Sequence, residues 1–520
     1  MTVLDVQPAP PRGALRVMQL GAIAVVLVAA TLNVFELDRF FIPKELVLHL
    51  TALIAAFLVT RLMIARVDRW LLLFLLLSVV SAVFATNHWL AIRAVAISVS
   101  GVLLFWIARA LRERSLARPL LNTLAFAVVL CAITSLLQTY GIELTIFSEN
   151  RAPGGTLGNR NFVAHIAAFG WPLVLLSALR GRSVFPGAIG ATIVVASMVL
   201  TRSRAAWLAF AAVLIIFFIA ILASRPTRTD GRTWRRLILI AIVIAGGVAA
   251  ALLVPNTLQW RSDNPYLETV KRVADYQGGS GAGRLVQYEQ SMRMALRHPL
   301  LGVGPGNWAV VYPEHAARHD PSLSDSEGGT TSNPWPSSDW VAMIAERGAV
   351  TAVLLALAFL GIFGGTVRQL RSAVDVEEGL IAATLLGVIA GAVVTGMFDA
   401  VLLLAVPTFL VWAAFGALYV PAVTAPAPRI IPIVMIVLAL AGVARSAMQL
   451  AAMQIYATRS DRASLAQAAQ IDPGNYRLRL RLARMGRRQQ RCEHALAAHA
   501  LYPNADAARE LSRGCGRSEN

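Results

Sequence analysis

Thirteen long apolar runs dominate this sequence of 520 residues and constrain its fold more than any other feature. A run of about 18 or more apolar residues can cross the hydrocarbon core of a bilayer as one helix. The chain is 57% hydrophobic, and a soluble domain could not bury that much apolar side chain. We predict an all-α fold, a polytopic membrane helix bundle of about 12–13 spans. The runs lie near residues 14–35, 44–64, 69–86, 90–110, 118–139, 161–179, 184–202, 205–224, 236–254, 340–364, 379–398, 402–422 and 430–450.

Arginine clusters between these runs predict the orientation of the bundle. The formal net charge is +18, and Lys occurs only at Lys44 and Lys271. Arginines gather in alternate connections, as at 109–118 and 225–236, whereas the connection "ATNHW" has no Lys or Arg. By the positive-inside rule, the N-terminus is therefore cytoplasmic and membrane lipids surround the bundle. Because the arginines form no soluble basic patch, we expect no nucleic-acid partner.

This orientation divides the chain into four predicted parts. Residues 1–254 form an N-terminal transmembrane bundle, and residues 339–450 form a second group of transmembrane helices. Between them, residues 255–338 form a large polar loop on the periplasmic side or its equivalent. Residues 451–520 form a small, polar, Ala-rich helical tail on the same side as the loop.

The tail carries a repeat-like pattern. The segments "AAQIDPGNY" and "AAHALYPNAD" place Pro473 and Pro503 thirty residues apart, which resembles the helix-end signature of tetratricopeptide repeats. An ordinary amphipathic helical tail is the alternative. In either case we expect the tail to dock a protein partner. Cys492 and Cys515 lie in this part, which we place in an oxidising compartment, and we predict a disulfide between them.

Arginines close to the outer membrane face are the candidates for chemistry. Arg202 and Arg204 lie in "TRSRAAWLAF", between two apolar runs, and Arg284 begins an amphipathic helix in the polar loop. A charge at that depth is costly without a partner, and the planar guanidinium fits phosphate or pyrophosphate oxygens. For Arg202 we favour a structural role, in which the side chain extends along the apolar surface and places its guanidinium at the membrane–water interface. The histidines lack metal-ligand spacing and "GVGPG" lacks the Lys-Ser/Thr of a phosphate loop, so we predict no metal and no cofactor.

Four segments occur in the order and spacing of a known family. They are "GGTLGNRNFVAHIAAFGWPL", "LTRSRAAWLAF", "GRLVQYEQSMRMALRHPLLGVGPGNW" and the helix with "AERG". Over roughly residues 150–420 the chain resembles the O-antigen ligase and O-antigen polymerase superfamily, which are glycosyltransferases of the bacterial inner membrane. The resemblance implies metal-independent transfer of a glycan from an undecaprenyl-pyrophosphate carrier to a hydroxyl of a lipid, glycan or protein acceptor, on the periplasmic face. It also implies that Arg204 and Arg284 hold the pyrophosphate of the donor.

The sequence departs from this family at the histidine that activates the acceptor. When the "AERG" element is aligned, the histidine position falls on Ser337. A neutral serine cannot accept a proton at physiological pH as an imidazole can. The nearest replacement is Asp339, which we predict to be catalytic together with Arg284. The alternative for Asp339 is a helix N-cap.

Three other residues could take part in the reaction as bases or as charged partners. His315 and His319 in "PEHAARHD" are the remaining candidate bases, and they would have to fold back from the loop. For Glu346, in the "AERG" element, we expect a buried partnership with an arginine rather than direct catalysis.

The sequence leaves the reaction open between ligation of a finished glycan and polymerisation of repeat units. Two further hypotheses come from other classes. One is a degenerate ligase-like scaffold that organises surface polysaccharide assembly, which the missing histidine favours and the retained arginines oppose. The other is a secondary transporter, for which Asp399 is the only candidate near the outer end of a helix. Transporters usually show inverted repeats, and no such internal repeat is present.

Overall fold

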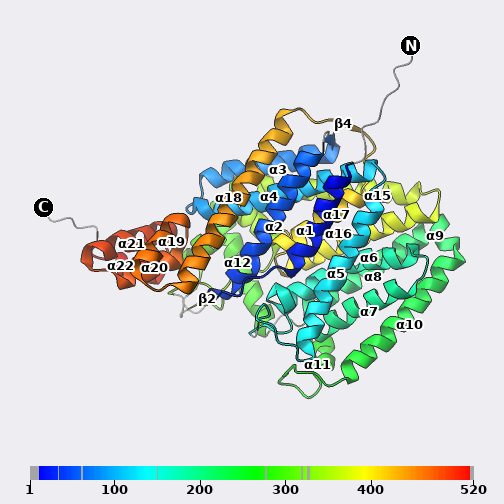
Figure 1. The fold of residues 1–520 in the computed structure, drawn as a ribbon, viewed down its shortest axis with the longest axis horizontal. Helices are drawn as coiled ribbons and strands as arrows, with labels where there is room; N and C mark the ends of the chain where they lie inside the picture. The colour runs from blue at the N-terminus through cyan, green and yellow to red at the C-terminus, as the bar shows by residue number, and fades with distance from the viewer. Residues whose placement is uncertain are drawn as a thin grey trace, which may run out of the picture.

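The computed structural model of the chain describes residues 11–32, 34–59, 62–148, 150–273, 275, 278–317, 320–324 and 328–515. Within these ranges the chain is mainly α-helical, which confirms the predicted fold class (Figure 1). Of the described helices, nine are long and apolar enough to cross a membrane, namely α2, α4, α5, α6, α8, α10, α15, α16 and α18.

The elements follow in four groups. The first group is α1 (Arg12–Leu27), α2 (Glu36–Leu58), α3 (Arg66–Val83), α4 (His88–Glu113), α5 (Ala117–Thr139), η1 (Gly155–Leu157), α6 (Arg160–Arg180), α7 (Phe185–Leu200), α8 (Arg204–Ala223), α9 (Arg225–Thr229) and α10 (Gly231–Leu253). The polar loop contains α11 (Pro265–Lys271), α12 (Gly279–Arg297), α13 (Trp308–His315), β2 (Leu323–Ser324) and β3 (Thr330–Thr331). The chain then forms α14 (Asp339–Arg347), α15 (Ala349–Arg371), α16 (Val376–Phe398), α17 (Ala405–Leu418) and α18 (Ile430–Thr458). The tail contains α19 (Arg462–Ile471), α20 (Tyr476–Met485), α21 (Arg488–Leu501) and α22 (Asp506–Ser512). Strands β1 (Met63–Ala65) and β4 (Thr424–Pro426) pair antiparallel, as do β2 and β3.

Each of the thirteen predicted spans coincides with a helix, but not all are full-length spans. Helices α1, α7 and α17 have only 16, 16 and 14 residues. Helix α3 has 18 residues and carries charges in its first turn. The run predicted at 340–364 is divided into α14 and α15, because Gly348 between them has a positive φ of 82°. This break sets α14 apart as a short helix at the membrane boundary.

The bundle packs around α6, α16 and α17. Helix α16 packs against α8 and α6, and α17 packs against α4. All fourteen residues of α17 are buried, which a short apolar helix in the centre of the bundle explains. In contrast, α10 lies outside α7 and buries only Thr233 and Ile240, so its apolar surface is available to lipid.

Several charges inside the bundle are paired. Arg109, expected in a cytoplasmic connection, is instead buried within α4, where Nη2 lies 2.7 Å from Asp68 Oδ2. Arg93 forms a bidentate pair with the buried Glu45. Such pairing is what allows a charged residue to remain in an apolar surrounding.

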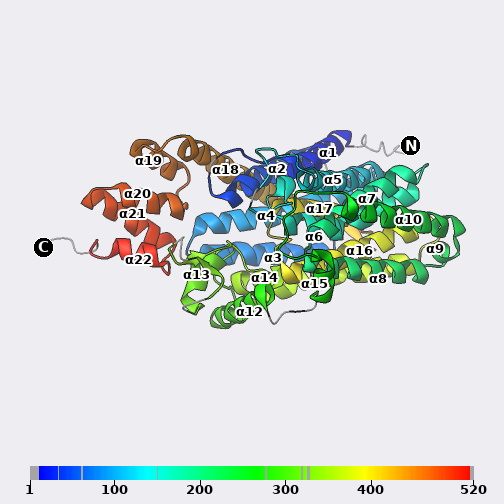
Figure 2. The same cartoon turned by 90° about the horizontal axis from the view of Figure 1, so that it is seen from below.

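The tail and the polar loop lie at the same end of the molecule, as the sequence predicts. Figure 2 shows the tail helices beside α13, with α9 at the far end of the bundle. The backbone N–H of Ala507 in α22 donates to Gly328 O at 3.2 Å, which joins the tail to the loop directly. The predicted disulfide between Cys492 and Cys515 is present and ties α21 to the end of the chain. The tetratricopeptide resemblance and the division into four domains stay predictions.

Candidate functional site

Two sequence motifs of the polar loop and of α14 dock on each other at the membrane boundary. In the turn "GVGPG", Val303 N donates to Ala345 O at 3.0 Å, and Gly304 N donates to Glu346 O at 2.9 Å. Gly302 has a φ of 66°, and a Cβ there would lie 2.3 Å from the carbonyl carbon of Glu346. Glycine is therefore required in this turn by both backbone conformation and close approach.

Glu346 fastens the same turn with its side chain. Its carboxylate is buried and accepts the backbone N–H of Gly306 at 2.8 Å and that of Trp308 at 3.2 Å. The predicted burial of Glu346 is confirmed, but the predicted ion pair between Glu346 and an arginine is wrong. Among the described residues, Glu346 forms no ion pair with an arginine, because the turn amides already occupy both oxygens. Glu346 thus holds the loop on α14.

A cavity of about 500 Å³ lies where the starts of α6, α8 and α12 meet α11. We call it the arginine cavity because five arginines line it. They are Arg160, Arg202, Arg204, Arg272 and Arg284. The acidic residues in its lining are Glu268 and Asp275, so positive charge is in excess. Arg204 and Arg284, singled out from distant parts of the sequence, are therefore brought to one cavity by the fold.

The arginines of this cavity differ in what they bind. Arg204 Nη1 donates to the backbone oxygens of Arg272 at 3.0 Å and Asp275 at 2.7 Å, which places its guanidinium against the end of α11. Arg284 makes no hydrogen bond or ion pair within the described part of the chain. Its guanidinium is half-buried at the cavity wall. Arg284 is accordingly the arginine that is most readily available to an anionic ligand.

Arg202 does not simply extend to the interface, as we favoured from the sequence. Its Nε donates to Thr269 Oγ1 at 2.9 Å, and its guanidinium lies 5.0 Å from the centre of the Trp260 ring. The Arg160 guanidinium lies 4.8 Å from the same ring. Arg202 also has a φ of 57°, a left-handed conformation that costs a non-glycine residue about 1 kcal/mol. These contacts attach the loop to the turn between α7 and α8.

Asp339 is not the helix N-cap that the sequence offers as the alternative to a catalytic base. Ser338, not Asp339, caps α14, since its side chain accepts the N–H of Val341. Asp339 is fully buried, and its two oxygens accept the backbone N–H groups of Val401 and Leu402 at 2.9–3.1 Å. Burial raises the pKa of this carboxyl to about 8, and the amide contacts oppose that rise. An acceptor hydroxyl could reach Asp339 only by displacing these amides, so the geometry favours a structural role.

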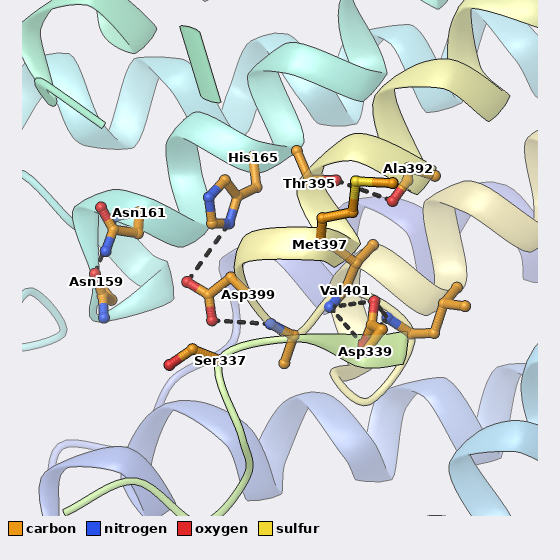
Figure 3. A network of polar contacts seen from close by, with 12 residues as sticks. Asn159, Asn161, His165, Ser337, Asp339, Ala392, Thr395, Met397, Asp399 and Val401 are labelled. Atoms are coloured by element: carbon orange, nitrogen blue, oxygen red, sulfur yellow. Dashed lines mark hydrogen bonds and ion pairs between the residues drawn. The ribbon is translucent and has the colours of Figure 1, made fainter. Parts of the chain in front are cut away.

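The turn that Asp339 holds carries a second carboxylate, that of Asp399. Ser337 lies near the same end of α16, since the Tyr288 hydroxyl is 2.6 Å from the backbone oxygen of Ser337 and 2.7 Å from that of Met397. Figure 3 shows the Asp399 carboxylate between the His165 ring and Ser337. Asp399 Oδ2 lies 3.8 Å from His165 Nδ1, and Oδ1 accepts the N–H of Ala400 at 2.8 Å. His165 is buried in α6, and neither of its ring nitrogens has a hydrogen-bond partner in the described structure. Asn161, which lines the arginine cavity, precedes His165 by one turn of α6, so the pair lies next to that cavity.

Sequence reasoning missed this pair. The sequence offers Asp399 only as a candidate transporter residue, and it indicates no role for His165. The usable signal was the position of Asp399 at the outer end of an apolar helix, where a charge needs a partner. Of the other candidate bases, His315 is not part of this site. His315 ends α13 and lines neither the arginine cavity nor the Asp399 surroundings, and His319 lies outside the described residues.

Fold and site together define a multi-pass membrane protein of the all-α class, whose polar loop contributes to an arginine-lined cavity. Residues 189–356 match the model of the O-Antigen ligase family. The matched segment includes Arg204, Arg284, the "GVGPG" turn and the "AERG" element, and it supports the resemblance of this part of the chain to the O-antigen ligase superfamily. Family members are glycosyltransferase-type enzymes that act on lipid-linked glycans. No curated protein matches the chain.

Proposed function

We propose that this protein transfers a glycan from an undecaprenyl-pyrophosphate carrier to an acceptor hydroxyl on the periplasmic face of the inner membrane, with its N-terminus in the cytoplasm. One observation carries the proposal. The arginine cavity, which suits a pyrophosphate, lies one turn of α6 away from the carboxylate–histidine pair of Asp399 and His165.

The donor occupies the arginine cavity in this proposal. Arg284 and Arg204 bind the pyrophosphate oxygens, because a guanidinium makes charge-assisted, bidentate hydrogen bonds with such groups. The cavity lies at the outer ends of α6 and α8, so the prenyl chain can remain in lipid while the glycan extends into the periplasm. Arg202 and Arg160 hold Trp260 and thereby fix the loop wall around the donor.

The glycan is transferred between the donor in the arginine cavity and an acceptor hydroxyl next to Asp399. The acceptor oxygen forms a bond to the anomeric carbon, and the bond from that carbon to the pyrophosphate oxygen breaks. The electron pair leaves with the pyrophosphate, whose growing charge the arginines stabilise. The acceptor proton passes to the Asp399 carboxylate. We propose Asp399 in place of Asp339 as this base, with His165 and Asp339 as positioning residues, and without a metal or cofactor.

The test is turnover by the purified, full-length protein in lipid nanodiscs. The donor is an undecaprenyl-pyrophosphate oligosaccharide, and a mixed pool of acceptors is supplied. Mass spectrometry measures release of undecaprenyl pyrophosphate and the mass of the new glycoside, which separates ligation from polymerisation. Arg284→Ala should lower turnover about 100- to 1000-fold, as loss of one preorganised charge-stabilising group does.

Arg297→Ala is the matched control. It removes an arginine from the other end of the same helix, where Arg297 is exposed and lies 3.7 Å from Glu314. Its turnover should remain that of the wild type. Equal turnover in Arg284→Ala and the wild type would refute the donor assignment. Donor binding without any turnover in the wild type would favour the scaffold alternative.

A further inference from the structure

A second cavity, of about 100 Å³, lies between the tail and the membrane bundle. We call it the tail cavity. Its walls come from the outer ends of α2 and α4, from the segment before α14, and from α18 and α20. Aromatic rings form much of its lining, including Trp89, Trp335, Tyr476 and Tyr502. Carboxylates of Asp38 and Asp472 stand among these rings, together with side-chain amides and guanidinium groups.

The tail cavity is formed by specific docking of the tail on the bundle. Asp472 Oδ1 accepts Trp89 Nε1–H at 2.6 Å, and Asp472 Oδ2 accepts Asn475 Nδ2–H at 2.9 Å. Gly474 lies so close to Trp89 that a Cβ would approach its side chain to 2.3 Å. The "IDPGNY" segment, which looked like a repeat signature, therefore serves as the tail's attachment to α4. Because these contacts fix both walls, the cavity is preorganised.

A smaller cavity of about 50 Å³ continues from the tail cavity toward the reaction site. The two cavities share five lining residues, namely Leu90, Arg93, Pro334, Trp335 and Tyr502. The smaller cavity also reaches Leu403, which follows the turn held by Asp339. Trp335 stands two residues before Ser337 in the chain. The two cavities thus run from the tail to the segment that precedes α14 and to the turn that precedes α17.

The lining of the tail cavity matches the chemistry of a saccharide. A sugar ring presents a face of C–H groups, which packs on aromatic rings such as Tyr476 and Tyr502, whose centroids lie 4.6 Å apart. Its hydroxyls both donate and accept, so carboxylate, amide and guanidinium groups satisfy them in a partly buried site. A lipid chain, by contrast, offers no hydrogen bonds to the polar side chains of this lining, such as Asp38, Asn475 and Arg477.

We propose that the tail cavity binds a saccharide unit of the acceptor, which the smaller cavity then guides toward Ser337 and Asp399. The inference rests on the proposed transfer reaction. The tail cavity has no lining residue in common with the arginine cavity, so donor and acceptor can be bound together. In this arrangement the tail forms part of the enzyme's acceptor site and selects the acceptor by its sugar.

The test measures binding without turnover. Methyl glycosides of glucose, galactose and N-acetylglucosamine are the probes, and saturation-transfer NMR on the nanodisc-embedded protein reports contact with them. Tyr502→Ala removes an aromatic wall, while Tyr502→Leu keeps apolar bulk against Tyr476 if the alanine variant folds poorly. Tyr140→Ala is the control, because Tyr140 ends α5 and lines neither cavity.

We expect saturation of at least one glycoside by the wild type and by Tyr140→Ala, and at least a fivefold loss in both Tyr502 variants. No saturation in the wild type, or equal saturation in all variants, would overturn the proposal. Preferential binding of an unstructured peptide would overturn it in favour of a protein acceptor. Since the assay needs no donor, its failure is distinguishable from failure of the transfer reaction itself. In turnover, the Tyr502 variants should raise the acceptor KM and leave the donor KM unchanged.

Discussion

Replacement of Asp399 by Asn is the sharpest test of the reaction site. The substitution keeps the shape of the side chain, and an amide oxygen can still accept the N–H of Ala400 as Oδ1 does at 2.8 Å. Only the ability to accept a proton is lost. A positioned general base contributes about 100- to 10,000-fold, which corresponds to about 2.7–5.4 kcal/mol at about 1.36 kcal/mol per tenfold change in rate.

The pyrophosphate leaving group is already good, so we expect a loss near the lower end, about 100-fold in kcat. The assay is release of undecaprenyl pyrophosphate at saturating acceptor, with donor binding measured separately. Donor binding should not change, because Asp399 does not line the arginine cavity. The matched control is Asp375→Asn, at the other end of α16, where Asp375 caps the helix and Asn caps equally well.

A rescue variant strengthens this test. Backbone groups of Ser337 bind Gln287 and Tyr288, so a histidine side chain at this position leaves both contacts in place. Ser337→His should restore turnover to Asp399→Asn by returning the family's imidazole. His165→Phe, which removes a positioning group and keeps bulk, should lower kcat without a change in donor KM. Wild-type turnover in Asp399→Asn would refute the assignment of the base.

Two further predictions concern the backbone that supports the site and the orientation of the polar loop across the membrane. Gly348→Ala should lower both the thermal stability and the turnover of the protein, because a Cβ at this positive-φ residue would lie 2.0 Å from the backbone oxygen of Leu300. A thermal melt in detergent measures the change in melting temperature. An unchanged melting temperature would contradict the argument. For the orientation, Arg261→Cys in the polar loop should react with a membrane-impermeant maleimide in intact cells, while Arg182→Cys should react only after lysis. The reverse pattern would place the loop in the cytoplasm.

Much of the site's composition could be predicted from the sequence, and its geometry could not. Arg204 and Arg284 stand in recognisable motifs, and the structure places both in one cavity. The direction of Asp339 was not predictable, because an Asp before an apolar run is equally a cap or an exposed acid. It points instead to the turn before α17, a contact across distant segments that leaves no local pattern.

The number of apolar runs and the fold class follow from the sequence alone. Lipid offers the backbone no hydrogen bonds, so each long apolar run has to be helical whatever its neighbours are. The disulfide was predictable for a similar reason, since the compartment decides which cysteines can pair.

Only the tertiary structure decided which polar groups meet. His165 and Asp399 come from α6 and α16, and they approach because these helices pack side by side. The tail cavity likewise exists only because Asp472 and Gly474 dock on Trp89. Hydrophobicity is a property of each segment and is visible in its residues. A site is a property of the distances between segments, and packing sets those distances.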